Sequence, residues 1–223
     1  MAAEALLTAL DSKSIPHFTP SSTEFTSLAA NFVLSGARPS VVVRPRDAAQ
    51  VAAAVAACVA HGQPFSVRSG GHDIGGRSVV EGVVNLDMRD VNHVVVAADR
   101  ASARVGGGIL AGHLANELER EGLLTPTGQV ASVGYVGWST LGGYGPFAPR
   151  YGLGVDQILA ARVVDARGEI VEADEELLKA IRGGGGAFGV VVELTIQVYP
   201  LHEVSWLPLL SCRMQDDHGS RAN

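Results

Sequence analysis

The segment RSGGHDIGGRS, residues 68–78, places four glycines and a histidine directly after PFSVRS at 64–69, a run typical of a strand. Two more segments concentrate glycine in the same way, ASVGYVGWSTLGGYG at 131–145 and RGGGGAFG at 182–189. Glycine adopts left-handed backbone conformations and lets a ligand touch the main chain, and successive N–H groups in such turns form concave anion sites. One such cluster is ordinarily a tight turn, but three together predict a phosphorylated ligand.

The composition is that of a globular protein without a nucleic-acid partner. Hydrophobic residues make up 47% of the 223 residues and charged residues 18%, with a formal net charge of −6, which does not favour binding to a polyanion. The start lacks the basic region and apolar run of a signal peptide, and no segment is long enough to cross a membrane. We therefore expect a cytoplasmic protein without a membrane partner. Cys58 and Cys212 have neither disulfide-framework nor metal-ligand spacing, so no metal site is predicted.

Apolar patterning predicts strands and helices in alternation. Asp47 is expected to cap a helix whose apolar stripe is Val51, Val55, Cys58 and Val59, which makes Cys58 a core residue rather than a nucleophile. A parallel or mixed sheet with helices follows from this order. The expected helices are 1–13, 47–61, 109–121 and 174–182, and the expected strands are 40–44, 64–69, 83–88, 91–98, 158–165, 169–173 and 188–198, with a hairpin turn at 166–168.

One short motif suggests a dinucleotide fold. Residues 143–148, GYGPFA, fit Gly-x-Gly-x-x-Ala, and Asp165 follows about 20 residues later. The segment before it, GWSTLG, is not a β-branched strand, and RYGLG after it interrupts any long helix. A nicotinamide-nucleotide protein therefore remains a weaker alternative, and a P-loop is excluded because its glycine-lysine signature is absent from the sequence.

Six segments occur in one order: RSGGHDIGG, LDMRDVN, ARVGGG, TGQVASVGYVGWSTLGGYG, RYGLGVDQI and RGGGGAFGVVVELTIQVYPL. Over about Ser40 to Leu201 the chain resembles the FAD-binding PCMH-type domain of the vanillyl-alcohol-oxidase superfamily, and within it the berberine-bridge-enzyme-like and 6-hydroxy-D-nicotine-oxidase-like flavoproteins. The resemblance implies an α+β fold, a PCMH-type FAD-binding domain of two α/β subdomains with mixed sheets. We expect an N-terminal helical or irregular segment at 1–35, the FAD-binding domain at 36–201 and an irregular tail at 202–223. Members of this family continue into a substrate domain, so the resemblance implies a truncated product.

The resemblance also implies the cofactor site. Ser69, Gly70 and Gly71 would cradle the FAD pyrophosphate, and His72 would be joined through its ring to the 8α-methyl of the flavin. A neutral imidazole nitrogen is a suitable nucleophile for that carbon, and an adjacent anion site fixes the geometry. Many relatives carry a second link through a cysteine, but Val130 stands at that position here, so a single histidyl link is expected. The full set of implied FAD-binding residues is Arg68, Ser69, Gly70, Gly71, His72, Asp73, Val130, Ser132, Val133, Gly134, Gly137, Gly142, Gly143, Gly145, Gly189, Val190 and Val191.

The implied reaction is hydride transfer from an organic small molecule to FAD and then electron transfer to oxygen, in secondary metabolism. Val133 stands where a small residue in this family leaves room for oxygen, which favours an oxidase, although it is equally suited to be a core residue. Ala187 replaces an asparagine common in the family, which removes one expected contact near the flavin. No catalytic base can be named, and the alternative function is an FAD-binding module without catalytic activity.

Overall fold

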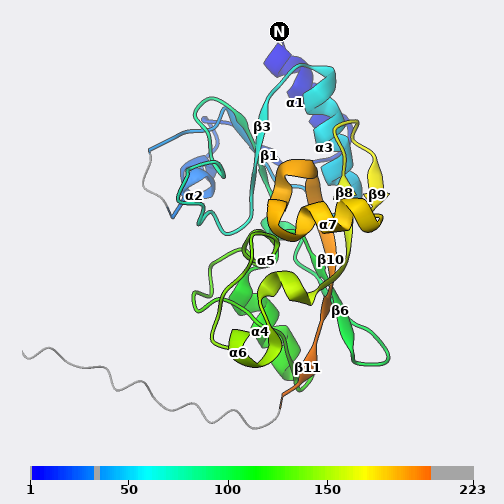
Figure 1. Cartoon of the computed structure of the whole chain (residues 1–223). Helices are drawn as coiled ribbons and strands as arrows, with labels where there is room; N and C mark the ends of the chain where they lie inside the picture. The colour runs from blue at the N-terminus through cyan, green and yellow to red at the C-terminus, as the bar shows by residue number, and fades with distance from the viewer. Residues whose placement is uncertain (1, 33–35, 202–223) are drawn as a thin grey trace, which may run out of the picture.

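Two β-sheets organise the chain, and each has its own covering helices. The structure, a computed structural model, describes residues 2–32 and 36–201. Figure 1 shows the first sheet with α1 and α3 in the upper half of the molecule, and α4, α5 and α6 in the lower half. The predicted tail at 202–223, with Cys212, lies outside the described residues.

The first sheet has the strand order β1-β2-β4-β3. Strands β2 and β3 run parallel to β4, and β1 runs antiparallel to β2. The parallel strands VVV and VNLD are buried along their whole length, as expected when a sheet is covered on both faces. The bounds are β1 His17–Phe18, β2 Val41–Val43, β3 Phe65–Arg68 and β4 Val84–Asp87.

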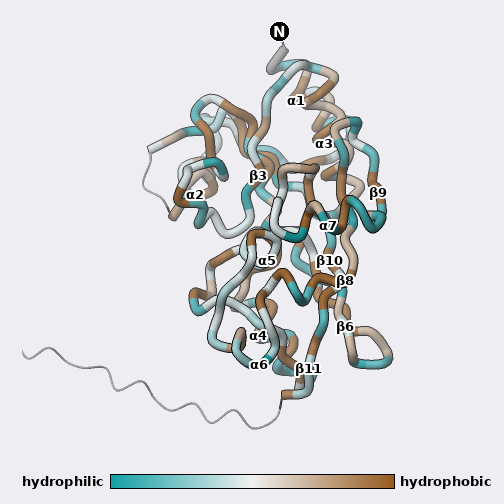
Figure 2. Tube along the Cα trace, in the orientation of Figure 1, coloured by the Kyte–Doolittle hydropathy of each residue, from teal (hydrophilic) through white to brown (hydrophobic). Residues whose placement is uncertain are grey.

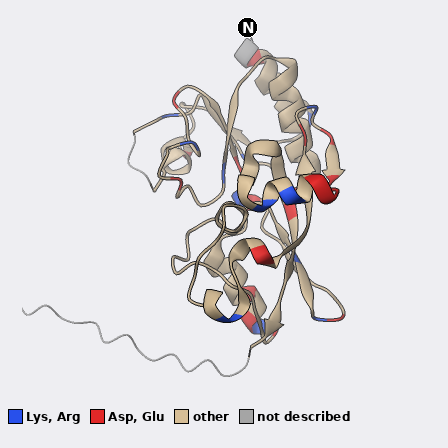
Figure 3. Cartoon of the chain, in the orientation of Figure 1, with Lys and Arg blue, Asp and Glu red and all other residues tan. Residues whose placement is uncertain are grey.

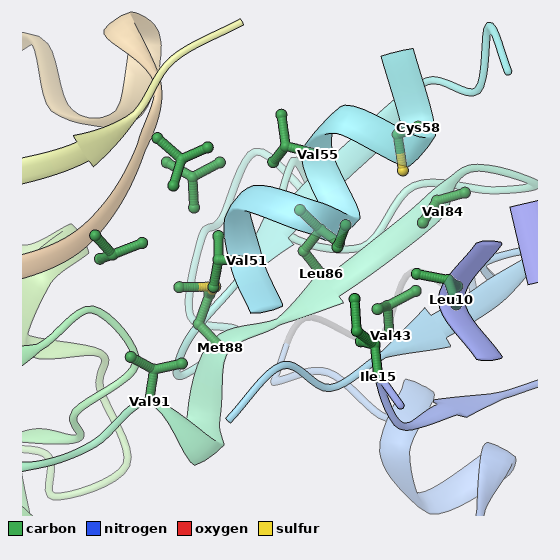
Figure 4. Close-up of a cluster of buried hydrophobic side chains, with 14 of the residues drawn as sticks. Leu10, Ile15, Val43, Val51, Val55, Cys58, Val84, Leu86, Met88 and Val91 are labelled. Carbon is green, nitrogen blue, oxygen red and sulfur yellow. The ribbon is translucent and has the colours of Figure 1, made fainter. Parts of the chain in front are cut away.

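Helices α1 (Ala2–Ser12) and α3 (Ala48–Ala60) complete the core of this half. Figure 4 shows Leu10, Val55 and Leu86 among the side chains that meet between the helices and the sheet. Because α1 contributes to this core, the predicted boundary at residue 36 does not coincide with a change of core; it remains a prediction, as does the boundary at residue 202.

The expected N-cap of α3 is confirmed, since the Asp47 carboxylate accepts a hydrogen bond of 2.8 Å from the Gln50 amide. Cys58 is fully buried, and burial raises the pKa of its thiol to about 11. The prediction for Val59 is wrong, because its side chain is 53% exposed and Ala54 is buried instead. At about 100° per residue, Val59 lies about 80° from Val51 around the helix, whereas Cys58 lies within about 20°.

The second sheet is antiparallel throughout, with the order β5-β6-β10-β8-β9. Its central strand β10 alternates between two cores: Val190 and Val192 join the core of the first half, whereas Val191 and Leu194 join the core of the second. This pattern confirms an α+β fold of two subdomains. The bounds are β5 Val94–Val96, β6 Ser102–Gly106, β8 Ile158–Val164, β9 Ile170–Glu172 and β10 Val190–Gln197.

Helices α4, α5 and α7 cover the inner face of the second sheet through residues such as Leu114, Tyr135 and Ile181.

The Asp174 carboxylate caps α7 by accepting a hydrogen bond from the Leu177 amide at 2.8 Å. Residues 166–168 form the expected turn between β8 and β9. The remaining bounds are α2 Phe25–Ala29, η1 Met88–Asp90, α4 Ala111–Arg120, β7 Leu123–Leu124, α5 Tyr135–Thr140, α6 Ala148–Tyr151, η2 Gly154–Gln157, α7 Glu175–Gly184, η3 Gly185–Phe188 and β11 Tyr199–Pro200, with β11 paired to β7.

Polar and apolar residues alternate along the trace of both halves, as Figure 2 shows. Basic and acidic residues are interspersed over the two halves in Figure 3. Across residues 2–32 and 36–201, the structure has no helix that combines the length and the apolar character needed to span a bilayer.

The two halves touch at main-chain distance in the turn that follows β6, where Gly107 and Gly108 come after the last strand residue, Gly106. A Cβ atom at Gly108 would overlap the carbonyl oxygen of Met88, the first residue of η1 in the other half, and one at Gly107 would overlap the carbonyl oxygen of Val191 in β10, the neighbouring strand of the same sheet. Main-chain atoms cannot withdraw as a flexible side chain can. Only glycine therefore allows the chain to pass between the two sheets here.

We expect Gly108→Ala to lower the free energy of unfolding by about 3 kcal/mol or more, because the new methyl group forces the backbone of β6 away from η1. Urea denaturation of the full chain measures this. The matched control is Gly137→Ala in α5, where a Cβ meets nothing within 4 Å. Its stability should stay the same or rise by up to about 1 kcal/mol. Equal losses in both variants would contradict the steric argument.

Candidate functional site

The loop after β3 and the loop before α5 meet in direct main-chain contact. A Cβ at Gly70 would overlap the carbonyl oxygen of Ser132 and the amide nitrogen of Gly134. A Cβ at Gly134 would lie 2.5 Å from the Ser69 Oγ. The structure thus brings together two groups of predicted site residues that are about 60 positions apart in sequence. The loop after β3 lies at the carboxyl end of parallel strands, where α/β proteins commonly bind ligands.

His72 lies where these two loops meet, and its imidazole is held on two sides. Its Nε2 atom is 2.9 Å from the Ser132 Oγ. The ring of Phe32 stacks on it with a centroid distance of 4.2 Å and an interplanar angle of 18°. Over the described residues no hydrogen-bond partner is found for Nδ1 of His72. One ring nitrogen is therefore engaged by Ser132, and the other has no hydrogen-bond partner among the described residues.

A cluster of arginine side chains around the buried Asp87 carboxylate lies next to the loop that follows β3. Arg68 is 5% exposed and donates to the carbonyl oxygen of Leu28. Burial, together with repulsion from Arg89, lowers the pKa of Arg68 to about 10, so it keeps its charge near neutral pH. The buried Asp87 carboxylate is bound by Arg89 at 2.5 Å and faces Arg44 at 3.7 Å.

Two donors of this region lack acceptors among the described residues. The Nε of Arg68 and the Oγ of Ser69 are buried without a hydrogen-bond partner. Buried donors are costly when unpaired. Unpaired donors, a surplus of arginine and a glycine-rich loop at the end of a parallel strand are together the features of an anion site.

Asp73 shapes the same loop rather than offering a free base. Its carboxylate accepts from the side chain of Arg77 at 2.7 Å and 2.9 Å, and from the Arg77 amide at 2.7 Å. These bonds from Arg77 lower the pKa of Asp73 to about 2. The carboxylate is therefore ionised and occupied at neutral pH.

Within the second glycine segment, Val133 is half-buried and its carbonyl accepts from the Ala111 amide at 2.9 Å, whereas Val130 is 50% exposed. Gly143 and Gly145 are packed against protein: a Cβ at Gly143 would lie 3.1 Å from the Trp138 ring, and one at Gly145 would overlap the Thr127 carbonyl oxygen. The nearest atoms to these two glycines are main-chain atoms, of Gly154 for Gly143 and of Thr127 for Gly145. Gly137 and Gly142, in contrast, border open space.

The third glycine segment leads into the central strand. A Cβ at Gly189, which has φ +140°, would lie 2.5 Å from the Val163 side chain, so this glycine lets β10 begin close to β8. Val190 and Val191 pair with Val164 and Val163 and are buried. None of the nearest neighbours of Gly143, Gly145 and Gly189 belongs to the His72 loop.

Some residues of the site were not predicted from the sequence. Phe32 and Asn31 carry no motif, because their contacts with the His72 loop join residues about 40 positions apart. Asp87 could have been suspected, since an acidic residue at the end of a short strand with Val84 and Leu86, two positions before Arg89, indicates a buried ion pair. Within residues 2–32 and 36–201, no three His, Cys, Asp or Glu side chains come together to bind a metal ion.

The dinucleotide alternative does not meet its structural condition. Residues 143–148 follow helix α5 rather than a strand, and they lead into α6, which has four residues. A Gly-x-Gly-x-x-Ala motif binds a dinucleotide at the turn from a strand to a long helix. The segment therefore lacks that architecture.

We expect the stability contributed by Asp73 to disappear in acid. Its folded pKa, about 2, lies below the ordinary value of 3.8, so the contribution is fully present above pH 3.8 and is lost as pH falls toward 2. Arg77 is largely exposed, which limits the effect to at most about 1 kcal/mol. Urea titrations at several pH values should show a smaller acid loss for Asp73→Asn than for the unchanged chain. Glu119→Gln, an exposed position on α4, should behave like the unchanged chain; an equal acid loss in Asp73→Asn would contradict the assignment.

Comparison with known proteins agrees with this geometry. The family described as "FAD binding domain" matches residues 39–174. The chain is 37% identical over 184 residues to (R)-6-hydroxynicotine oxidase of Paenarthrobacter nicotinovorans, covering 78% of this chain and 40% of that protein. It is 40% identical over 190 residues to an FAD-linked oxidoreductase of Gibberella zeae, covering 84% and 38%. The chain thus spans about two fifths of the length of these relatives.

Solved structures give the same match. The crystal structure of 6-hydroxy-D-nicotine oxidase from Arthrobacter nicotinovorans superimposes with a TM-score of 0.80 at 34% identity, covering 83% of this chain and 42% of that one. BBE-like 1 from Physcomitrella patens gives a TM-score of 0.84 at 29% identity, covering 87% and 44%. The family match at residues 39–174 includes the His72 loop.

Proposed function

Since the chain belongs to the FAD binding domain family, we propose that it is the flavin-carrying part of an FAD-linked oxidase, with the flavin joined by a single bond to His72. The observation that carries this proposal is the contact of Gly70 with Ser132 and Gly134, which sets a histidine with one free ring nitrogen beside an anion site. The relatives with the names oxidase and oxidoreductase support the reaction class.

The residues present fit an FAD pyrophosphate. Ser69, Gly70 and Gly71 follow a parallel strand, and the unpaired Arg68 Nε and Ser69 Oγ lie under the same loop. A phosphate group supplies the negative charge and the acceptors that this region lacks. The buried positive charge of Arg68 also attracts a phosphate at longer range.

When bound, FAD supplies the redox chemistry, taking a hydride from an organic small molecule and passing the electron pair to oxygen to form hydrogen peroxide. Attachment to His72 would replace one C–H bond of the 8α-methyl group and the imidazole N–H bond with a C–N bond. This is a two-electron oxidation, for which the flavin and then oxygen would be the acceptors, with hydrogen peroxide as the product. The chain's own part in this step is to hold the imidazole.

Ser132 determines which nitrogen of His72 reacts. The hydroxyl engages Nε2 at 2.9 Å, which leaves Nδ1 as the nitrogen available for bond formation. Val130 lies in the loop before Ser132 and has no nucleophilic atom, so a second covalent link from this position is not possible. Val133, half-buried in the same loop, is the residue we assign to admit oxygen.

We expect flavin to stay with acid-precipitated protein in the unchanged chain and to be released in His72→Ala. The measurement is the yellow absorbance of the pellet and the supernatant, with the mass of the intact chain as a second readout. His113→Ala is the matched control, because His113 is an exposed histidine on α4 that contacts Glu117 at 3.7 Å. Flavin released from the unchanged chain would contradict the covalent link but not FAD binding.

Gly137→Ala tests whether the flavin lies against α5. A Cβ at this position meets nothing within 4 Å, so the fold should tolerate it. If the cofactor occupies that open space, its dissociation constant should rise about tenfold, equivalent to about 1.4 kcal/mol. Titration of flavin-free protein with FAD, followed by flavin fluorescence, measures the change. Gly186→Ala, also in open space, serves as the control, and equal affinities of the two variants would remove Gly137 from the site.

The second candidate function is an FAD-binding module without activity of its own. The observation that favours it is that the chain spans about two fifths of the length of its catalytic relatives. Bleaching of the bound flavin by an organic donor without oxygen would support the oxidase. A flavin that only dithionite can bleach would favour the binding module.

A further inference from the structure

We propose that Phe32 is a positioning residue that fixes the plane of the His72 imidazole for bond formation with the flavin, and that Asn31 anchors it to the loop. This inference rests on the proposed function, because it concerns how the same histidine is made ready. Among the aromatic rings of residues 2–32 and 36–201, Phe32 stacks on that of His72 alone, and it acts through that ring rather than on a substrate.

Two contacts restrict the imidazole in different ways. The Phe32 ring, stacked at 4.2 Å and 18°, limits tilting of the imidazole plane. The Ser132 hydroxyl, 2.9 Å from Nε2, limits rotation within that plane. The Phe32 stacking and the Ser132 hydrogen bond together fix the orientation of the imidazole, and therefore the direction in which Nδ1 points. With only one of these contacts, the ring could still tilt or rotate in its plane.

The segment that carries Phe32 is fastened to the loop by its main chain. The Phe32 amide donates to the carbonyl oxygen of Gly71 at 3.3 Å and to the Asn31 Oδ1 at 3.0 Å. The Asn31 Nδ2 donates to the Ser78 Oγ at 3.3 Å. Asn31 therefore ties the two ends of the 71–78 loop to the residue that stacks on His72.

The position of Asn31 restricts residue 71 to glycine. It has φ +71°, and a Cβ there would overlap the Oδ1 of Asn31. The asparagine fills the space that a side chain at residue 71 would need. Farther back, Arg68 donates to the Leu28 carbonyl in α2, so the whole 25–32 segment is attached to the start of the loop.

The exposure of the Phe32 side chain indicates that Phe32 contributes little to the stability of the fold. The side chain is 66% exposed, and Phe32 belongs to neither core cluster. Its removal therefore leaves both cores intact. Because its aromatic contact is with His72, the effect of a substitution should appear at the histidine.

The first test uses the full chain without flavin. Stacking under an aromatic ring moves the His72 ring protons upfield in NMR spectra, and His72→Ala assigns these signals. We expect Phe32→Leu to remove the upfield shift and Phe32→Tyr to keep it. If the unchanged chain shows no upfield shift, the stacking contact is absent in solution and the inference is overturned, whatever the flavin does.

The second test measures the rate at which added FAD becomes acid-stable on the flavin-free chain. We expect Phe32→Leu to slow attachment about fivefold to tenfold, Phe32→Tyr to restore the rate, and non-covalent FAD affinity to change little. Val59→Ala, which trims an exposed apolar side chain on α3, is the control and should react at the unchanged rate.

The outcomes separate this inference from the proposed function. Attachment at the unchanged rate in Phe32→Leu, with the upfield shift lost, would overturn the positioning role and leave the His72 link standing. A clear upfield shift in a chain that binds FAD but never attaches it would overturn the covalent link, and the positioning role with it. Slow attachment in Phe32→Leu together with rescue by Phe32→Tyr would support the proposal.

Discussion

Main-chain contact between distant segments is the constraint on which the molecule depends. At Gly70 and Gly134 two loops touch without room for a side chain, and at Gly108 the turn after β6 touches η1 in the same way. The first contact places His72 beside Ser132, and the second brings the two halves of the chain to main-chain distance. The glycines that determine the site are thus those whose neighbours belong to the other of the two loops. Gly143 and Gly145 also pack closely, but against Gly154 and Thr127, which lie outside the His72 loop.

The charges around the site follow from the same arrangement. Parallel strands β2, β3 and β4 end on one side of the sheet, and Arg44, Arg68 and Asp87 lie at these ends. Three guanidinium groups, those of Arg44, Arg68 and Arg89, share two carboxylates, the buried Asp87 and the exposed Asp90 that binds Arg44, so this group keeps a small positive excess although the chain as a whole is acidic. The local field and the net charge therefore have opposite signs, and only the local field concerns a bound phosphate.

Much of the fold could be predicted from the hydrophobic periodicity, the cap residues and the turn residues of the sequence. The Asp47 cap, the hairpin at 166–168 and the positions Val51, Val55 and Cys58 of the α3 stripe are local features, and each is confirmed. Val59 was misplaced because a four-residue spacing drifts around the helix, and only three-dimensional packing decides which edge of the stripe is buried. The loops that meet at His72 were predicted through a resemblance, whereas Phe32, Asn31 and the Arg68–Leu28 contact were not. Those contacts join residues 40 or more positions apart through single atoms, which leaves no periodic trace in the sequence.

The position of β10 has a consequence for the order in which the molecule forms during synthesis. This strand is central to the second sheet, yet it comprises residues 190–197, after every strand with which it pairs. While the ribosome is still translating the segments before it, β6 and β8 have no partner between them, and their inner apolar faces stay open to water or to chaperones. Both cores close only when Val190, Val191 and Val192 emerge. Nascent chains arrested before residue 190 would thus bind chaperones persistently, and maturation of the whole domain would begin with the last strand rather than the first.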